Sequence, residues 1–103
     1  IVISFTDGGN SNYGTAVVGT VSGTNISFGT PVVFSAAGSF YNKIVFDSNV
    51  NKVAILYVTT DVKAIVGTVS GTSISFGTEV TFISGGSTSQ FSLAFDSNIR
   101  NDN

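Results

Sequence analysis

The stretch "GTVSGTNISFGT" covers Gly19–Thr30, and "GTVSGTSISFGT" covers Gly67–Thr78. These twelve-residue segments differ at a single position, Asn25 against Ser73. The match extends outward, so that residues 16–34 align with residues 64–82 with four differences in 19 positions. Downstream, "VFDSN" at residues 45–49 aligns with "AFDSN" at residues 94–98. A period of about 48 residues is typical of propeller blades and stacked arrays. We therefore treat residues 1–103 as a single two-repeat unit.

Every part of the period has the composition of a β-strand. Val, Ile, Phe and Thr dominate, Gly and Asn separate the apolar runs, and no window follows the helical i, i+3, i+4 pattern. We expect four strands in each period, which repeat along the chain. The expected strands are residues 40–47 and 91–96, residues 52–59 and 1–6, residues 63–70 and 15–22, and residues 74–82 and 26–34. The chain thus opens on the second strand of a period and ends with the first, which splits one blade between the two ends.

The central strands are apolar on both faces. In "VAILYV" (residues 53–58), Val53, Ile55 and Tyr57 point one way, and the alternate residues Ala, Leu and Val point the other way. An antiparallel sheet with one solvated face alternates apolar and polar residues instead. Because the sequence predicts no helix, other sheets must cover these faces. This favours stacked propeller blades, and a two-sheet sandwich remains the alternative.

The predicted fold is therefore an all-β propeller of antiparallel four-stranded blades, with about two blades per chain. Propellers have typically about 4–8 blades, so a two-blade chain needs further copies to complete a ring. Two, three or four copies would give four, six or eight blades. A rotation that does not close would give an open filament instead.

The segments "VGTVSGTSISFGTEVTF" (residues 66–82), "VFDSN" (residues 45–49) and "KVAILYV" (residues 52–58) carry a resemblance. They resemble tandem blade repeats of phage structural proteins and of environmental microbial surface proteins. Their layout is also similar to that of tachylectin-type lectin propellers. The resemblance implies a propeller with a structural or binding role, located outside the cell or on a virion surface. It assigns no ligand residue, because the chain has no Trp with which to carry over the tachylectin sugar site.

Composition narrows the function classes. Charged residues are 10% of the chain, against about 25% in ordinary soluble domains, and the net charge is −2. Four basic residues do not create the positive field that nucleic acid requires, and no apolar run reaches the roughly 20 residues of a membrane span. The absence of His and Cys excludes the usual catalytic triads and zinc–cysteine sites. We expect a non-enzymatic protein without cofactor or metal, and without nucleic-acid binding or membrane insertion.

One loop departs from the repeat. Residues 6–15, "TDGGNSNYGT", are four residues longer than their counterpart, and they contain Asp7, Asn10, Asn12 and Tyr13. Carboxylates and amides beside an aromatic ring are groups that bind sugars, and functional loops are often those that depart from the scaffold. The alternative is a glycine-rich hairpin turn in which Asp7 only stabilises local backbone.

Two further motifs carry weaker signals. Asn25 begins an Asn-Ile-Ser glycosylation sequon, which the second repeat lacks. Asp47 and Asp96 occupy equivalent "FDSN" segments and are interpreted as turn caps, because no spacing of a calcium loop surrounds them.

These observations leave three hypotheses for function. The first is a structural module that binds further copies of itself and forms an oligomeric propeller or fibre. The second is a lectin-like propeller that presents the loop of Asp7–Tyr13 several times to glycans. The third is a monomeric β-sandwich binding domain.

Overall fold

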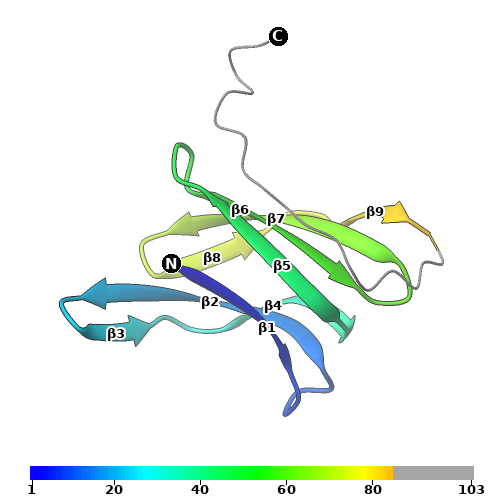
Figure 1. Cartoon of the computed structure of the whole chain (residues 1–103), viewed down its shortest axis with the longest axis horizontal. Coiled ribbons are helices and arrows are strands. Elements are labelled where there is room, and N and C mark those ends of the chain that lie inside the picture. Colours follow the sequence, from blue (N-terminus) through cyan, green and yellow to red (C-terminus); the bar gives the residue numbers. More distant parts are fainter. Residues whose placement is uncertain (85–103) are drawn as a thin grey trace, which may run out of the picture.

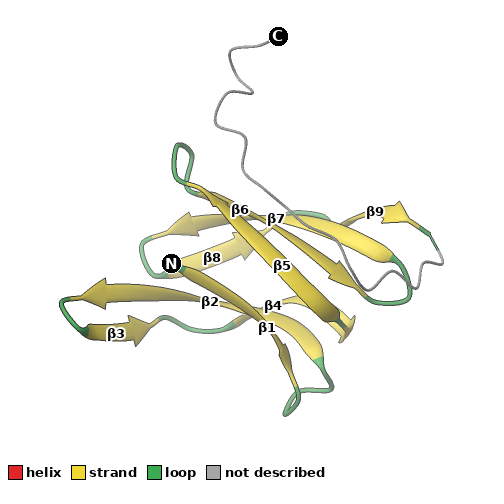
Figure 2. Ribbon diagram, viewed as in Figure 1, coloured by secondary structure: helices red, strands yellow, loops and turns green. Residues whose placement is uncertain are grey.

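A computed structural model describes residues 1–84, which form two antiparallel sheets without a helix (Figures 1 and 2). Sheet 1 contains β1 (Val2–Asp7), β2 (Tyr13–Ser22), β3 (Asn25–Phe28) and β4 (Val32–Gly38). Sheet 2 contains β5 (Phe40–Asp47), β6 (Lys52–Val58), β7 (Val62–Ser70), β8 (Ser73–Phe76) and β9 (Val80–Ile83). The predicted all-β antiparallel class is confirmed.

The two sheets share one strand order. In sheet 2, β5 pairs with β6, β6 with β7, and β7 with both β8 and β9. In sheet 1, β1 pairs with β2, and β2 pairs with both β3 and β4. Sheet 1 therefore repeats sheet 2 without a counterpart of β5. The segment predicted to supply that counterpart, residues 91–96, lies outside the described residues.

We predicted one continuous fourth strand in each repeat, and this prediction was wrong because each segment forms two strands. In sheet 1, Phe28 pairs with Gly19 and Val32 pairs with Ala16, so three residues of one strand oppose two residues of β2. Sheet 2 has the same break between β8 and β9. This extra residue is a β-bulge, which bends the strand and reverses the alternation of its side chains.

The turns follow the predicted chemistry. Gly23 and Gly71 adopt φ values of 63° and 62° in the two "SGT" turns, where glycine has no Cβ to strain the backbone. Asp47 accepts a hydrogen bond from the Asn49 amide at 2.9 Å, which confirms its interpretation as a turn cap. Strand boundaries that depended on these turns agree with the sequence to within a few residues.

Each sheet has two apolar faces, which we name by their residues. The isoleucine face of sheet 1 carries Ile3, Val21, Ile26 and Phe28. The equivalent residues on the isoleucine face of sheet 2 are, in the same order, Ile55, Val69, Ile74 and Phe76. The alanine face carries Ala16, Val18 and Val32 in sheet 1, and Ala64, Val66 and Val80 in sheet 2.

The core lies where the alanine face of sheet 1 packs on the isoleucine face of sheet 2. The buried cluster joins Ala16 and Val18 of β2 to Ile55 of β6 and Ile74 of β8. The rings of Phe34 and Tyr57 meet edge to face across the same contact, with centroids 5.0 Å apart. In Figure 1 the β2–β3 and β7–β8 hairpins lie on the same side of the stack, as expected when one sheet repeats the other.

A small polar cluster connects the sheets where β4 leads into β5. The Thr6 hydroxyl donates to the Ser39 carbonyl and accepts from the Asn42 side chain at 3.2 Å. The Ser39 amide donates to the Asn12 carbonyl at 3.0 Å, and the Ser39 side chain is fully buried. These bonds hold the first hairpin loop of sheet 1 against the start of sheet 2.

Candidate functional site

The candidate site consists of the two apolar faces that point away from the core. They are the isoleucine face of sheet 1 and the alanine face of sheet 2. The exposed apolar residues on them, with their neighbour Ile1, are Ile1, Ile3, Val21, Ile26, Phe28, Val66 and Val80. Contiguous exposed apolar surface of this kind marks interaction sites in soluble proteins.

The isoleucine face of sheet 1 has the sequence of a buried surface. Ile74 of sheet 2 is 6% exposed, whereas its equivalent Ile26 is 44% exposed. Ile55 is 0% exposed, whereas its equivalent Ile3 is 38% exposed. Since the surrounding residues are the same or conservatively changed, the difference arises from position in the stack. In sheet 2 another sheet lies against this face, whereas in sheet 1 Ile3, Ile26 and Phe28 are exposed and Val17, which pairs with Ile3, is 8% exposed.

The alanine face shows the opposite asymmetry. Val18 in sheet 1 is 4% exposed, and its equivalent Val66 in sheet 2 is 49% exposed. Val80 is also exposed, although its equivalent Val32 packs against the core. Each of the two outward faces therefore matches one side of the contact that already exists inside the chain.

A pair of equivalent glycines supports the same conclusion. A Cβ placed on Gly29 would lie 2.1 Å from the Thr72 carbonyl oxygen, so the backbones of the two sheets approach too closely there for a side chain. Its equivalent Gly77 is open, and a Cβ there would meet only the Val66 carbonyl oxygen at 3.8 Å. Neither glycine has a positive φ. In the single chain, packing requires glycine at position 29 but not at position 77.

The two repeats differ in a polar group beside the core. The buried Tyr57 hydroxyl donates to Glu79 at 2.5 Å, and Lys63 forms a salt bridge with the same carboxylate at 3.2 Å. Burial raises the pKa of the Tyr57 phenol above its usual value, and the hydrogen bond to Glu79 adds to the effect. The Tyr57 hydrogen bond lowers the pKa of Glu79, and Lys63 lowers it further. The group stabilises packing inside the chain.

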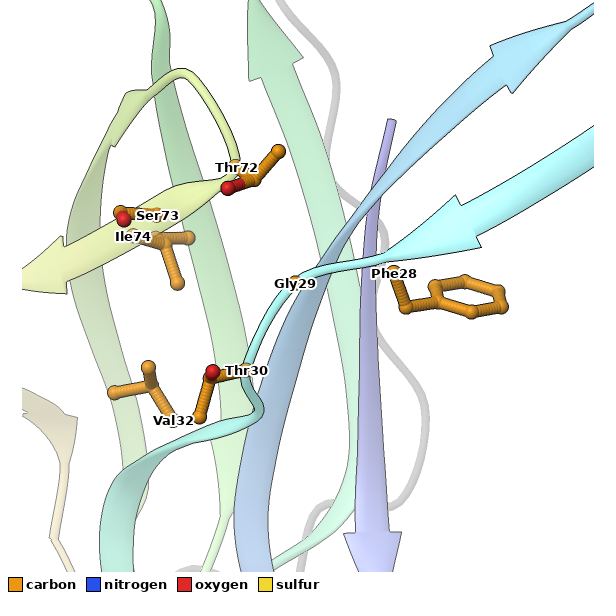
Figure 3. A pocket seen from close by; sticks show the side chains of 7 residues that line it. All are labelled: Phe28, Gly29, Thr30, Val32, Thr72, Ser73 and Ile74. Atoms are coloured by element: carbon orange, nitrogen blue, oxygen red, sulfur yellow. The ribbon is translucent and has the colours of Figure 1, made fainter.

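A cavity of about 370 Å³ lies between the β3–β4 link and the β7–β8 turn (Figure 3). In Figure 3 the side chains of Val32 and Ile74 face each other across it, with the Thr30 hydroxyl beside them, whereas the Phe28 ring points away. The cavity thus offers apolar walls and hydroxyl groups. We interpret it as a gap between stacked sheets.

The predicted sugar-binding residues lie together in the hairpin between β1 and β2. Asp7 accepts a hydrogen bond from the Gly9 amide at 3.0 Å, and its carbonyl accepts from the amides of Asn10 and Asn12. Asn10 and Asn12 are exposed, and Tyr13 is half-buried at the start of β2. The turn explains why Asp7 is present, and sugar binding by this loop stays a prediction.

The remaining predicted features concern modification, metals and membranes. Asn25 is exposed at the first residue of β3, and its glycosylation stays a prediction. Within residues 1–84, no three acidic side chains gather into a possible metal site. In the same range, no helix has the length and apolarity to span a membrane.

Comparison with protein-family models, with curated proteins and with solved structures finds no match to this chain. The double-faced strands of the sequence predicted that both faces of each sheet are apolar, and they did not indicate which faces would point outward. The sequence did not indicate the polar cluster of Thr6, Ser39 and Asn42, because isolated Ser, Thr and Asn residues have no distinctive pattern.

Proposed function

We propose that this chain is a non-enzymatic assembly module whose sheets are blades of an oligomeric β-propeller or fibre. The observation that supports it best is the pair of exposed apolar faces, each equivalent to a face that is buried inside the chain. In water, burial of exposed Ile, Val and Phe surface stabilises by roughly 25 cal/mol per Å². A second sheet against each face would provide that burial.

The two sheets are better explained as blades than as a closed sandwich. A sandwich directs its apolar faces inward toward each other and its polar faces outward. Here the packed faces are not equivalent, since an alanine face meets an isoleucine face, and both outward faces expose apolar side chains, although the alanine face of sheet 2 also carries Lys43 and Lys52. Stacking in one direction is the arrangement of propeller blades and of open arrays.

Surface chemistry supports a structural role outside the cell or on a virion. The chain has few charges and relies on Ser, Thr, Asn and Gly for its polar surface. The carboxylates of Asp7 and Asp47 stabilise turns, and Glu79 pairs with Tyr57 and Lys63. These contacts assign the three carboxylates to the scaffold.

Sedimentation velocity over a hundredfold range of concentration tests the proposal. We expect species at multiples of the 10.6 kDa chain mass. The Val66→Lys variant should shift these species toward the monomer, and Ser48→Lys, in an exposed turn, is the matched control. A wild-type chain that stays at 10.6 kDa throughout contradicts the proposed function.

A further inference from the structure

We propose that copies of this chain associate head to tail, so that the alanine face of sheet 2 in one copy receives the isoleucine face of sheet 1 in the next. This inference rests on the proposed function and specifies its partner, a second copy, and its orientation. The alternatives are isologous pairs, in which two alanine faces or two isoleucine faces meet each other.

The contact inside the chain provides the template. There, an alanine face carrying Ala16 and Val18 already packs on an isoleucine face carrying Ile55 and Ile74. The alanine face that remains free carries Ala64 and Val66, which are identical in type to the first pair. A head-to-tail contact therefore reproduces a packing arrangement that this sequence already forms, whereas an isologous contact requires a new one.

The free isoleucine face fits the same template. Ile3 and Ile26 stand where Ile55 and Ile74 stand in sheet 2, and Phe28 stands where Phe76 does. Each face also has a glycine close to its phenylalanine ring, which is Gly19 in sheet 1 and Gly67 in sheet 2. A Cβ on Gly67 would lie 2.7 Å from the Phe76 ring, and a Cβ on Gly19 would lie 3.2 Å from the Phe28 ring. On both faces, a glycine therefore leaves room for the ring of the neighbouring phenylalanine.

Gly77 gives the most specific evidence for direction. Inside the chain, Gly29 leaves room for the Thr72 carbonyl of the adjoining turn. Thr24 occupies the position equivalent to Thr72, and it lies in the β2–β3 turn at the end of the free isoleucine face. If the template repeats between copies, Thr24 of the next copy approaches Gly77. The head-to-tail contact therefore accounts for a glycine that nothing else in the described residues requires.

The contact differs from its template at one end. The internal contact includes Tyr57, Glu79 and Lys63, whereas the equivalent residues of sheet 1 are Phe5, Pro31 and Thr15. The contact between copies would thus bury a phenylalanine where the internal one buries a hydrogen-bonded tyrosine. It has no ion pair at this position, although Lys43 and Lys52 lie on the same alanine face of sheet 2.

Two variants, each with one outward face blocked by a lysine, test whether association is head to tail. Ile26→Lys blocks the isoleucine face, and Val66→Lys blocks the alanine face; both residues are exposed in the single chain, so folding should persist by circular dichroism. In a head-to-tail contact, each variant alone is monomeric by sedimentation velocity. An equimolar mixture forms a dimer of twice 10.6 kDa and stops there, because only one productive contact remains.

The outcomes separate this inference from the proposed function. A wild-type chain that never associates overturns both. A wild-type chain that associates while Ile26→Lys or Val66→Lys alone still forms dimers overturns only the head-to-tail direction. Should a lysine variant fail to fold, Gly77→Ala provides the second test, with Ser48→Ala as its control. We expect Gly77→Ala to weaken association at least tenfold without altering the fold, and unchanged association would overturn the inference.

Discussion

Ile26 and Ile74 lie within nearly identical twelve-residue segments, yet one is exposed and the other is buried. Both segments form the same hairpin, with the same glycine at positive φ in the turn. Local sequence therefore determines the hairpin and its register, and it does not determine burial. Burial is determined by whether another sheet lies against that face, which within residues 1–84 is true for only one of the two repeats.

The largest expected contrast concerns the isoleucine pair at the centre of the faces. Ile55→Ala should lower the free energy of unfolding by about 2–5 kcal/mol, because it leaves a cavity in the core. Ile3→Ala should cost about 1 kcal/mol or less in dilute solution, where Ile3 is 38% exposed on the outward face of sheet 1. Urea unfolding followed by circular dichroism measures both. Equal losses in dilute solution would mean that Ile3 is already covered within one chain.

The glycine pair should show a smaller contrast. Gly29→Ala forces the Thr72 backbone to move and should cost about 1–3 kcal/mol. Gly77→Ala has open space around its Cβ and should change the unfolding free energy by about 0.5 kcal/mol or less. The same urea titrations apply, at a concentration where the chain is monomeric. A large destabilisation by Gly77→Ala would show that the two positions have similar surroundings.

The polar group of sheet 2 should give a pH dependence that sheet 1 lacks. The pKa of Glu79 is lowered in the folded chain, so its stabilising effect is present above the ordinary value of 4.5 and is lost as the pH falls below it. The pKa of Tyr57 is raised, so its effect is present at neutral pH and is lost at strongly alkaline pH.

The variant Glu79→Gln tests this effect. Its unfolding free energy should fall less steeply than that of the wild type between about pH 5 and pH 3. Urea titrations at several pH values measure the slope. Asp7→Asn, in an exposed loop of sheet 1, serves as the control, since its carboxylate accepts a hydrogen bond from the Gly9 amide. Identical slopes for Glu79→Gln and the wild type would contradict a lowered pKa for Glu79.

The turn aspartates should have the smallest effects. Asp47→Ala and Asp7→Ala each remove one hydrogen bond to an exposed turn amide and should cost about 0.5–1 kcal/mol. The two losses should be similar, although the loop of Asp7 is longer. A glycan array with the wild type, Asp7→Ala and Tyr13→Ala tests the lectin-like hypothesis at the same time. Sugar binding by the wild type that both variants lose would favour that hypothesis.

Much of the fold could be predicted from the sequence, because turns and alternation are local properties. Gly23 and Gly71 marked two hairpins, and "VAILYV" indicated a sheet with two apolar faces. The break at Gly29–Pro31 could not be predicted in this way, because it also occurs at Gly77–Glu79, where no proline is present. The bulge arises from the register against β2 and β7, which depends on pairing across the sheet.

The candidate site was only partly predictable. The sequence indicated that the sheets need neighbours on both faces, and it directed attention to Asp7 and Tyr13 as a ligand loop. It did not indicate which faces remain open, because Val18 and Val66 are the same residue in the same motif. Only the order of stacking inside the chain distinguishes them. The sequence likewise does not distinguish Gly77 from Gly29, because only the structure shows that Gly29 is crowded and Gly77 is open.

The solvent accessibility of individual methyl groups would show whether association covers the outward faces. Nuclear magnetic resonance with a soluble paramagnetic agent would report the exposure of Ile26 and Ile74, and of Val18 and Val66, at low and high protein concentration. The account predicts that Ile26 and Val66 are accessible in dilute solution and become as protected as Ile74 and Val18 when the chains associate. Methyl groups of Ile26 and Val66 that stay accessible in the associated protein would contradict it.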